Sequence, residues 1–285
     1  MAISLEDLKQ FIGKTAPATD EVTASPIARL AATLGMDNPA PSKGDIIPVG
    51  WHGLYFLPVY GPDAMREDGQ TTGGGFMPPV PLARQRLRGD SYGFMAPLRV
   101  GDEMTRTTEI TAIDIEEDEH GPVVYLYYRQ TIGCERGKAV TEDRAFYFFG
   151  EDRPTPGDFA PTINEEPDWS REIEPTAALL FRYSALRFNT HRIHYDYRFA
   201  TESEGLPGLL IQGTLVSHLL LELCRTACPD RAITSFGYRT WKPIFDTGNF
   251  TIQGALSSYG KSASLWCRDQ NGGITTTAQA TIDVS

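Results

Sequence analysis

The segment 208–224, GLLIQGTLVSHLLLELC, places the strongest constraint on how this chain can fold. It predicts a helix over 213–224 that is apolar on nearly every face, through Leu215, Val216, Leu219, Leu220, Leu221 and Leu223. The segment is no candidate membrane span, because polar residues interrupt it at Gln212, Gly213, Ser217, His218 and Glu222. Such a helix has to be enclosed by other elements, and a curled sheet encloses a helix well.

Strand-like segments occur both before and after this helix. They are rich in β-branched and aromatic residues, alternate in part, and are separated by turn residues, over 102–117, 121–133, 138–150, 232–244, 248–259, 262–269 and 274–284. Residues 96–113 and 242–258 also share a proline, a bulky apolar residue, a glycine turn and an alternating strand. We therefore expect a duplicated unit, an antiparallel sheet curled around one helix, occurring twice.

The remaining segments set the expected boundaries. Residues 4–35 predict two short helices, with Ser4 and Asp7 as a capping pair, Ser25 as the second N-cap, Pro26 at the first helical position and Gly35 as the stop signal. Residues 178–186, ALLFRYSAL, resemble a strand. The stretch 150–170 is rich in proline and acidic residues. It predicts an N-terminal domain over 1–155, a linker over 156–170 and a C-terminal domain over 171–285.

Composition excludes several classes of function. The chain has 285 residues, is 41% hydrophobic and carries a formal net charge of −11. This charge argues against nucleic acid and against an anionic membrane surface, and a polyanionic ligand would need local basic residues. The four cysteines show no metal-ligand spacing and predict buried, reduced thiols. The N-terminus lacks the pattern of a signal peptide. We expect a soluble, cytoplasmic protein.

The stretch 187–197, RFNTHRIHYDY, concentrates the residues that carry chemistry. In one interpretation His194 and Asp196, with His191 nearby, form an acid–base group, since a histidine needs a second residue to fix its tautomer. In a second, His191, His194 and Asp196 bind a metal ion, although their spacing fits neither one helix face nor one strand face. In a third, the stretch is a polar surface turn. The residues alone leave these alternatives open.

The order of several segments resembles a known family. These are ASPIARLAATL, WHGLYFLP, GGFMPPVPL, APLRVGDEMTRT, FNTHRIHYD and GLLIQGTL, which span most of the chain. They resemble the MaoC-like hotdog enoyl-CoA hydratases, and most closely the double-hotdog branch of mesaconyl-CoA and itaconyl-CoA hydratases. The resemblance implies an α+β double hotdog, in which two antiparallel sheets are each wrapped around a central helix. It also implies a hydratase motif in the C-terminal half and none in the N-terminal half.

Transferred by position, the resemblance places His194 on the family's catalytic histidine. Asn189 falls where the family has its catalytic aspartate, and His191 where it has an asparagine. Because an asparagine exchanges no proton, we expect Asp196 to supply the carboxylate, on the same side as His194 if the stretch is a strand. Asn189 can still orient a water. Backbone N–H groups at Gly208 and Gly213 are expected to stabilise the thioester oxygen.

The reaction implied by the resemblance is addition of water to a short branched dicarboxylyl-CoA, itaconyl- or mesaconyl-CoA, giving citramalyl-CoA, or the reverse dehydration. It needs no cofactor or metal beyond the coenzyme A thioester itself. Basic residues are expected to bind the coenzyme A phosphates, namely Arg84, Arg86 and Arg88 on one strand face, with Arg239 and Lys242. Arg192, next to the histidines, is the first candidate for the second carboxylate.

Two alternatives remain at this stage. A hotdog thioesterase usually has a carboxylate on or beside the central helix, and only Glu222, near the far end, is available there. A non-catalytic acyl-CoA binding protein would be consistent with Asn189 at the aspartate position. In each interpretation the partner is a small-molecule acyl-CoA, with neither nucleic acid nor membrane, and a homodimer is possible.

Overall fold

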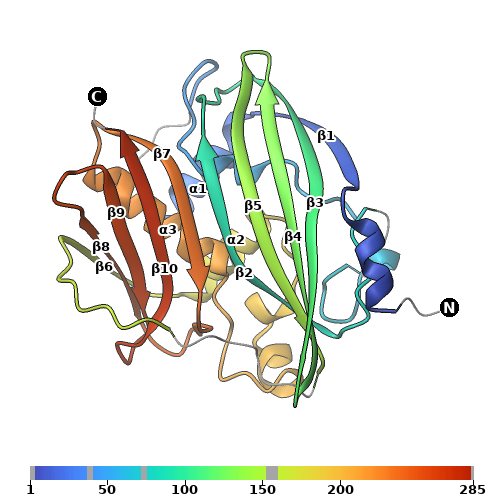
Figure 1. Ribbon diagram of the computed structural model, residues 1–285. Helices are drawn as coiled ribbons and strands as arrows, with labels where there is room; N and C mark the ends of the chain where they lie inside the picture. The colour runs from blue at the N-terminus through green and yellow to red at the C-terminus, as the bar shows by residue number, and fades with distance from the viewer. Residues whose placement is uncertain (1–3, 37–40, 72–75, 152–159, 284–285) are drawn as a thin grey trace.

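The strands of this protein form one continuous antiparallel sheet in the computed structural model, which describes residues 4–36, 41–71, 76–151 and 160–283 (Figure 1). Within these ranges the sheet has ten strands in the order β1-β3-β4-β5-β2-β7-β10-β9-β8-β6. The strands are β1 (Thr15–Glu21), β2 (Arg84–Phe94), β3 (Glu103–Asp118), β4 (Gly121–Cys134), β5 (Gly137–Phe149), β6 (Trp169–Ile173), β7 (Ala232–Thr240), β8 (Phe250–Leu256), β9 (Ser262–Arg268) and β10 (Ile274–Asp283).

The helices are fewer than the strands within the described ranges. The α-helices of the described ranges are α1 (Ala24–Thr33), α2 (Ala177–Leu186) and α3 (Gly213–Ala227). Single turns of other helix types are η1 (Glu6–Phe11), η2 (Trp51–Leu54), η3 (Pro62–Ala64), η4 (Arg192–His194) and η5 (Phe199–Ser203).

The sheet joins two halves along the pairing of β2 with β7. We call β1–β5 and their connections the N-terminal half, and β6–β10 with α2 and α3 the C-terminal half. The pairing runs from Gly89 opposite Arg239 to Gly93 opposite Ser235. At Gly89 a Cβ atom would lie 2.1 Å from the carbonyl oxygen of Tyr238, so only glycine permits this approach. The duplicated antiparallel unit expected from the sequence is confirmed, whereas the boundaries at 155 and 171 stay a prediction.

Helix α3 is the sheet-wrapped helix that the sequence predicts, and it begins at Gly213 as expected. It packs against each of β6 to β10 (Figure 1). Leu215 and Leu220 are fully buried, and the apolar residues of the helix belong to the largest core cluster. The N-terminal half has no equivalent helix of this length among its described residues: α1 makes its main contacts with α2 and η2.

Three local predictions are wrong. The strand expected over 178–186 is helix α2, because the Thr176 hydroxyl caps it by accepting the N–H of Leu179 at 3.2 Å. The strand β1 was not expected, since TAPATDE is polar and contains a proline; at the edge of the sheet it pairs only with β3. Helix α1 has Thr23 at its N-cap position and Ala24 as its first residue, each two residues before the expected Ser25 and Pro26.

Other local predictions are confirmed. The Ser4 N–H donates to the Asp7 carboxylate and the Asp7 N–H donates to the Ser4 hydroxyl, both at 3.2 Å, which is a reciprocal cap. Gly35 ends the second helix region with φ +70°. The four cysteines are free thiols, and burial raises the pKa of Cys224 to about 12. In the described part of the chain no helix is both long and apolar enough to cross a membrane.

Candidate active site

A cavity of about 1020 Å³ lies between the two halves and is lined by both. The N-terminal half contributes residues of β2 to β5 and of the connection that contains η2. The C-terminal half contributes the stretch after α2, the first turn of α3 and the segment after β7. The histidines and the asparagine singled out from the sequence, His191, His194 and Asn189, all line this cavity.

The stretch after α2 turns sharply before it reaches the histidines. Phe188 adopts a left-handed conformation with φ +47°. The side-chain oxygen of Asn189 then accepts the backbone N–H of His191 at 3.1 Å, an Asx turn. The chain continues into η4, which carries His194. The stretch is therefore not a strand, so the condition that would have placed Asp196 on the same side as His194 is not met.

His194 is held in one tautomer. Its Nδ1 lies 2.7 Å from the carbonyl oxygen of Leu210, and because a carbonyl only accepts, Nδ1 carries the proton. Nε2 therefore keeps its lone pair. The side chain is 8% exposed, and burial, helped by the charge of Arg86, lowers its pKa to about 4 even though the bond to Leu210 acts in the opposite direction. At neutral pH His194 is a proton acceptor.

His191 complements His194. The ring centroids lie 5.4 Å apart with the planes at 83°. The side-chain nitrogen of Gln70 is 2.8 Å from Nδ1 and 3.2 Å from Nε2 of His191, and an amide N–H only donates, so the shorter contact favours an unprotonated Nδ1 and a proton on Nε2. Burial lowers the pKa of His191 to about 2, and the charges of His194 and Arg86 act in the same direction. One histidine thus offers a donor and the other an acceptor.

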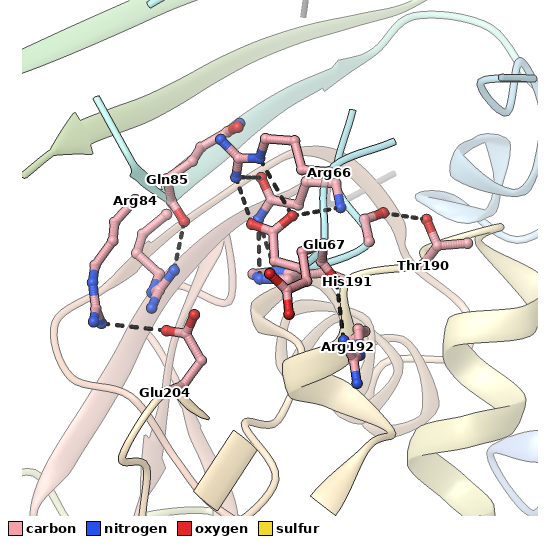
Figure 2. A network of polar contacts seen from close by, with 12 residues as sticks. Arg66, Glu67, Arg84, Gln85, Thr190, His191, Arg192 and Glu204 are labelled. Carbon is pink, nitrogen blue, oxygen red and sulfur yellow. Dashed lines mark hydrogen bonds and ion pairs between the residues drawn. The ribbon is translucent and has the colours of Figure 1, made fainter. Parts of the chain in front are cut away.

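A loop of the N-terminal half holds the histidine segment in place (Figure 2). The backbone N–H of Arg192 donates to the backbone carbonyl of Asp68 at 2.9 Å, and the Thr190 hydroxyl donates to the backbone carbonyl of Gly69 at 2.5 Å. At Gly69 a Cβ atom would lie 1.9 Å from the carbonyl oxygen of Thr190, so this contact requires glycine. Gln70 comes from the same loop, 121 residues from its partner His191. No sequence signal singles it out.

The N-terminus of α3 presents unsatisfied polar groups to the cavity. Gln212 is 2% exposed and donates to the Leu180 carbonyl at 3.0 Å and to the Ser184 hydroxyl at 2.8 Å. Its Oε1, like Oγ1 of Thr240, is buried without a partner within the described ranges. Gly213 follows at the first helical position, where a backbone N–H has no acceptor within the helix. Buried polar atoms without partners mark a place where a ligand supplies them.

Gly208 lies outside this cavity lining. A Cβ there would meet the Asp246 carboxylate at 2.3 Å, and the same carboxylate accepts the Leu209 N–H at 2.7 Å. Gly208 therefore belongs to a tight turn against Asp246, and of the two glycines expected at the thioester only Gly213 lines the cavity.

The predicted basic residues separate into two groups. Arg86 and Lys242 line the cavity. Arg84 and Arg86 share a face of β2, as expected, but Arg88 leaves it because it is the extra residue of a bulge between Leu87 and Gly89. Arg84 instead pairs with Glu204 at 3.3 Å. Arg88 and Arg239 line a separate groove, where Arg88 lies over the ring of Tyr125 and Arg239 over that of Trp241.

Asp196 and Arg192 bind each other. The carboxylate of Asp196 lies 2.8 Å from the guanidinium of Arg192 and also accepts the Phe199 N–H at 3.0 Å. These two contacts, that of Phe199 first, lower the pKa of Asp196. Neither Asp196 nor Arg192 lines the cavity. Among the described residues, no group of three or more histidine, cysteine, aspartate or glutamate side chains is arranged so that it could hold a metal ion.

Glu222, the carboxylate considered for a thioesterase, also lies away from the cavity. It accepts the indole N–H of Trp51 at 2.8 Å and pairs with Arg225 at 2.5 Å. Both oxygens are therefore engaged in buried or half-buried contacts at the far end of α3.

Comparison with known proteins agrees with this architecture. Residues 50–246 match the family model of hydroxyacyl-thioester dehydratase type 2. A mesaconyl-C(4)-CoA hydratase of Chloroflexus aurantiacus is 34% identical over 254 residues, 88% of this chain and 89% of that protein. A MaoC-like dehydratase structure superimposes with a TM-score of 0.70 at 15% identity, covering 98% of this chain and 100% of that one.

A Mycobacterium tuberculosis protein with a double hotdog fold superimposes with a TM-score of 0.58 at 13% identity, over 98% of both chains. These two structural matches show the fold. The family model covers both halves and the histidine segment, and its relatives are hydratases and dehydratases. The chain therefore belongs to the hydroxyacyl-thioester dehydratase type 2 family, a group of MaoC-like double-hotdog hydro-lyases.

Proposed function

We propose that this protein adds water reversibly to the double bond of a short, branched dicarboxylyl-CoA, mesaconyl-CoA or itaconyl-CoA, giving citramalyl-CoA. The observation that carries the proposal is His194, a buried, neutral histidine whose Nε2 is unprotonated and which lines the cavity together with the first turn of α3. The substrate class is supported by the Chloroflexus relative, whose name specifies a mesaconyl thioester.

His194 acts as the base in this proposal. Nε2 takes one proton from a water while the water oxygen bonds to the β-carbon of the acyl group. In a thioester whose double bond is conjugated with the carbonyl group, as in mesaconyl-C4-CoA, the electron pair of the double bond moves to the thioester oxygen as an enolate. Protonated His194 then returns a proton to the α-carbon, so the net change is addition of one water. The same steps in reverse give dehydration.

The enolate oxygen is stabilised at the N-terminus of α3. The backbone N–H of Gly213 donates to it, and the helix dipole favours the negative charge. The buried acceptors at Gln212 and Thr240 bind N–H or O–H groups of the bound thioester or water. His191 donates from Nε2, and Asn189 shapes the turn that presents both histidines. Asn189 thus positions the two histidines and, unlike an aspartate, does not exchange a proton.

Lys242 is the cation proposed for the coenzyme A phosphates. Its side chain is exposed, and it lines the cavity, so it lies where the cavity opens to solvent. A phosphate there is attracted by a local positive charge against the net charge of −11 of the whole chain.

The test is mass spectrometry of mesaconyl-CoA, itaconyl-CoA and crotonyl-CoA after incubation with the enzyme. Gain of one water by a branched dicarboxylyl-CoA, lost in His194→Ala and kept in His120→Ala, supports the proposal. His120 is a matched control because its side chain is exposed on the β3–β4 turn. Release of free coenzyme A would indicate a thioesterase, and unchanged thioesters would indicate a binding protein; either result contradicts the proposal.

A further inference from the structure

Arg86 is one of three arginines lining the cavity, with Arg106 and Arg187, that contact a backbone carbonyl but form no ion pair with the described residues. In the described ranges its guanidinium donates to the backbone carbonyl of Gln85 at 2.8 Å and takes part in no ion pair. It also lies 5.9 Å from the ring centroid of Phe149. Half-buried cations in proteins normally pair with an anion, so a cation of this kind in a cavity is suited to an anion that arrives with the ligand.

The carboxylates closest to Arg86 are already committed to other arginines. Glu204 pairs with Arg84 at 3.3 Å, and Asp68 pairs with Arg66 at 2.5 Å (Figure 2). Both act on Arg86 only through longer-range electrostatic attraction. The protein therefore surrounds this guanidinium with carboxylates that are already neutralised.

The other cavity arginines contact protein groups to different extents. Arg144 pairs with Asp90 at 3.0 Å and with Glu142 at 3.3 Å. Arg187 donates to the carbonyl of Gly53. Arg106 donates to the carbonyl of Phe56 at 3.2 Å and lies 4.8 Å from the centroid of that residue's ring, while its buried Nε has no partner in the described ranges. These contacts fix each guanidinium to the N-terminal half.

Arg86 is also the cation felt by both histidines. Its charge lowers the pKa of His194 and of His191, and among the arginines that the structure describes it is the one that acts on both. In a mesaconyl thioester the free carboxylate is one bond away from the double bond, so it has to lie beside the group that activates the water. The cavity therefore contains both the proposed base, His194, and an arginine without an ion pair, Arg86.

We propose that Arg86 binds the free carboxylate of the acyl group and so selects a dicarboxylyl thioester over a monocarboxylyl one. This inference rests on the proposed hydratase function and names the residue that sets its substrate class. A guanidinium matches a carboxylate with two parallel hydrogen bonds, which a lysine does not reproduce. Arg86 thus takes the role that the sequence suggested for Arg192, which is bound to Asp196.

The test compares two thioesters that differ only at the carboxylate, mesaconyl-C4-CoA and 3-methylcrotonyl-CoA. In Arg86→Met we expect kcat/KM for the dicarboxylyl thioester to fall about 10- to 100-fold, as for loss of a charged hydrogen bond, with less than a threefold change for the monocarboxylyl one. Arg86→Lys should recover part of the loss. Arg129→Met, which removes an exposed arginine paired with Asp143, should match the wild type.

A binding measurement keeps the inference testable even without turnover. Calorimetry of methylsuccinyl-CoA and isovaleryl-CoA, the saturated counterparts, should show weaker binding of only the first in Arg86→Met. Equal losses for both thioesters, in kinetics or binding, would overturn the role of Arg86 and leave the hydratase intact. A wild type that binds both equally and hydrates neither would overturn the inference and the proposed function together.

Discussion

Both halves of the sheet are antiparallel, but the inner face is apolar in one half and polar in the other. In the C-terminal half α3 covers the sheet, and the inner face is apolar, with Phe236, Ile252 and Leu265 buried against it. In the N-terminal half the strands present polar side chains to the cavity, Arg106, Thr108, Gln130, Glu142 and Arg144. One half is filled by its own helix, whereas the other is left open for a ligand.

The difference separates two tasks. The C-terminal half supplies the proposed base, His194, the carbonyl group that fixes its tautomer, and the N-terminus of α3. The N-terminal half supplies the space, the loop that positions His191 and the cation Arg86. A buried histidine, His52, also lines the cavity in the N-terminal half, 3.5 Å from Glu142. It provides the direct comparison with His194.

The largest expected effect is on catalysis. His194→Ala should lower kcat/KM about 10²- to 10⁴-fold, the range for loss of a general base. His52→Gln should change it by less than about tenfold, because the catalytic base belongs to the other half. Initial rates of thioester hydration, with thermal melting to verify folding, measure both. Equal losses of kcat/KM in His194→Ala and His52→Gln would contradict the assignment of the catalytic base to the C-terminal half.

The next effect is on stability at the junction of the halves. Arg144 pairs with Asp90 and Glu142, and although burial opposes it, this arginine and His52 lower the pKa of Glu142 to about 2. Arg144→Met leaves two buried carboxylates without their cation and should cost about 3–5 kcal/mol in the free energy of unfolding.

Urea denaturation measures this cost. Arg129→Met, which breaks the exposed pair with Asp143, is the control and should cost no more than about 1 kcal/mol. A similar, small cost for both variants would show that the junction does not depend on its buried charges.

A third comparison concerns the packing of the two inner faces. Leu220 is 0% exposed in the core beneath α3, so Leu220→Ala should lower the free energy of unfolding by about 2–5 kcal/mol. Gln130, whose amide lies 3.5 Å from the Thr108 hydroxyl, makes one long hydrogen bond on the open face, and Gln130→Leu should cost less than about 1 kcal/mol. Guanidinium denaturation measures the free energy of unfolding of both variants. A larger loss for Gln130→Leu than for Leu220→Ala would contradict the expected difference between the two inner faces.

The lowered pKa of His194 predicts how kcat/KM and stability depend on pH. Its pKa is about 4 in the folded protein, against 6.5 when exposed, so the base form and hence kcat/KM should persist until the pH falls toward 4. The unfolded chain takes up this proton first, so the same shift lowers stability as the pH falls from about 6.5 to about 4. Rapid-mixing rates with circular dichroism separate the two effects. An acidic limb near pH 6.5 in folded protein would contradict the buried, neutral base.

The smallest effect is expected at Asp196. Because its carboxylate binds Arg192 and the Phe199 N–H outside the cavity, Asp196→Asn should change kcat/KM by less than about threefold. Steady-state kinetics measure this. A loss as large as that of His194→Ala would restore Asp196 as the carboxylate of the acid–base pair.

Sequence patterns predicted the parts of the fold that depend on local periodicity. Helix α3 is recognisable because apolar residues surround it, and the later strands alternate as half-buried strands do. Helix α2 was mistaken for a strand because Leu, Phe and Tyr favour strands as readily as a buried helix, and only the cap at Thr176 decides the matter. Strand β1 exists through its pairing with β3, which its own polar residues do not indicate.

The site was predictable where its residues are neighbours in sequence. His191, His194 and Gly213 were identified from the stretch and the helix that carry them, and all three line the cavity. Gln70 comes from a loop 121 residues away, and the unpartnered oxygen of Gln212 is visible only once the chain has folded. The bulge in β2 likewise removed Arg88 from the face of Arg84 and Arg86, which no alternation rule anticipates.

The most direct test of the central claim is hydration of the thioester in ¹⁸O-labelled water, followed by mass spectrometry of the intact coenzyme A ester. The account predicts one labelled oxygen in the acyl chain of an uncleaved thioester for the wild-type protein and for His120→Ala, with none for His194→Ala. Labelled free acid with released coenzyme A, or unchanged labelling in His194→Ala, would contradict a His194-dependent addition of water between the two halves.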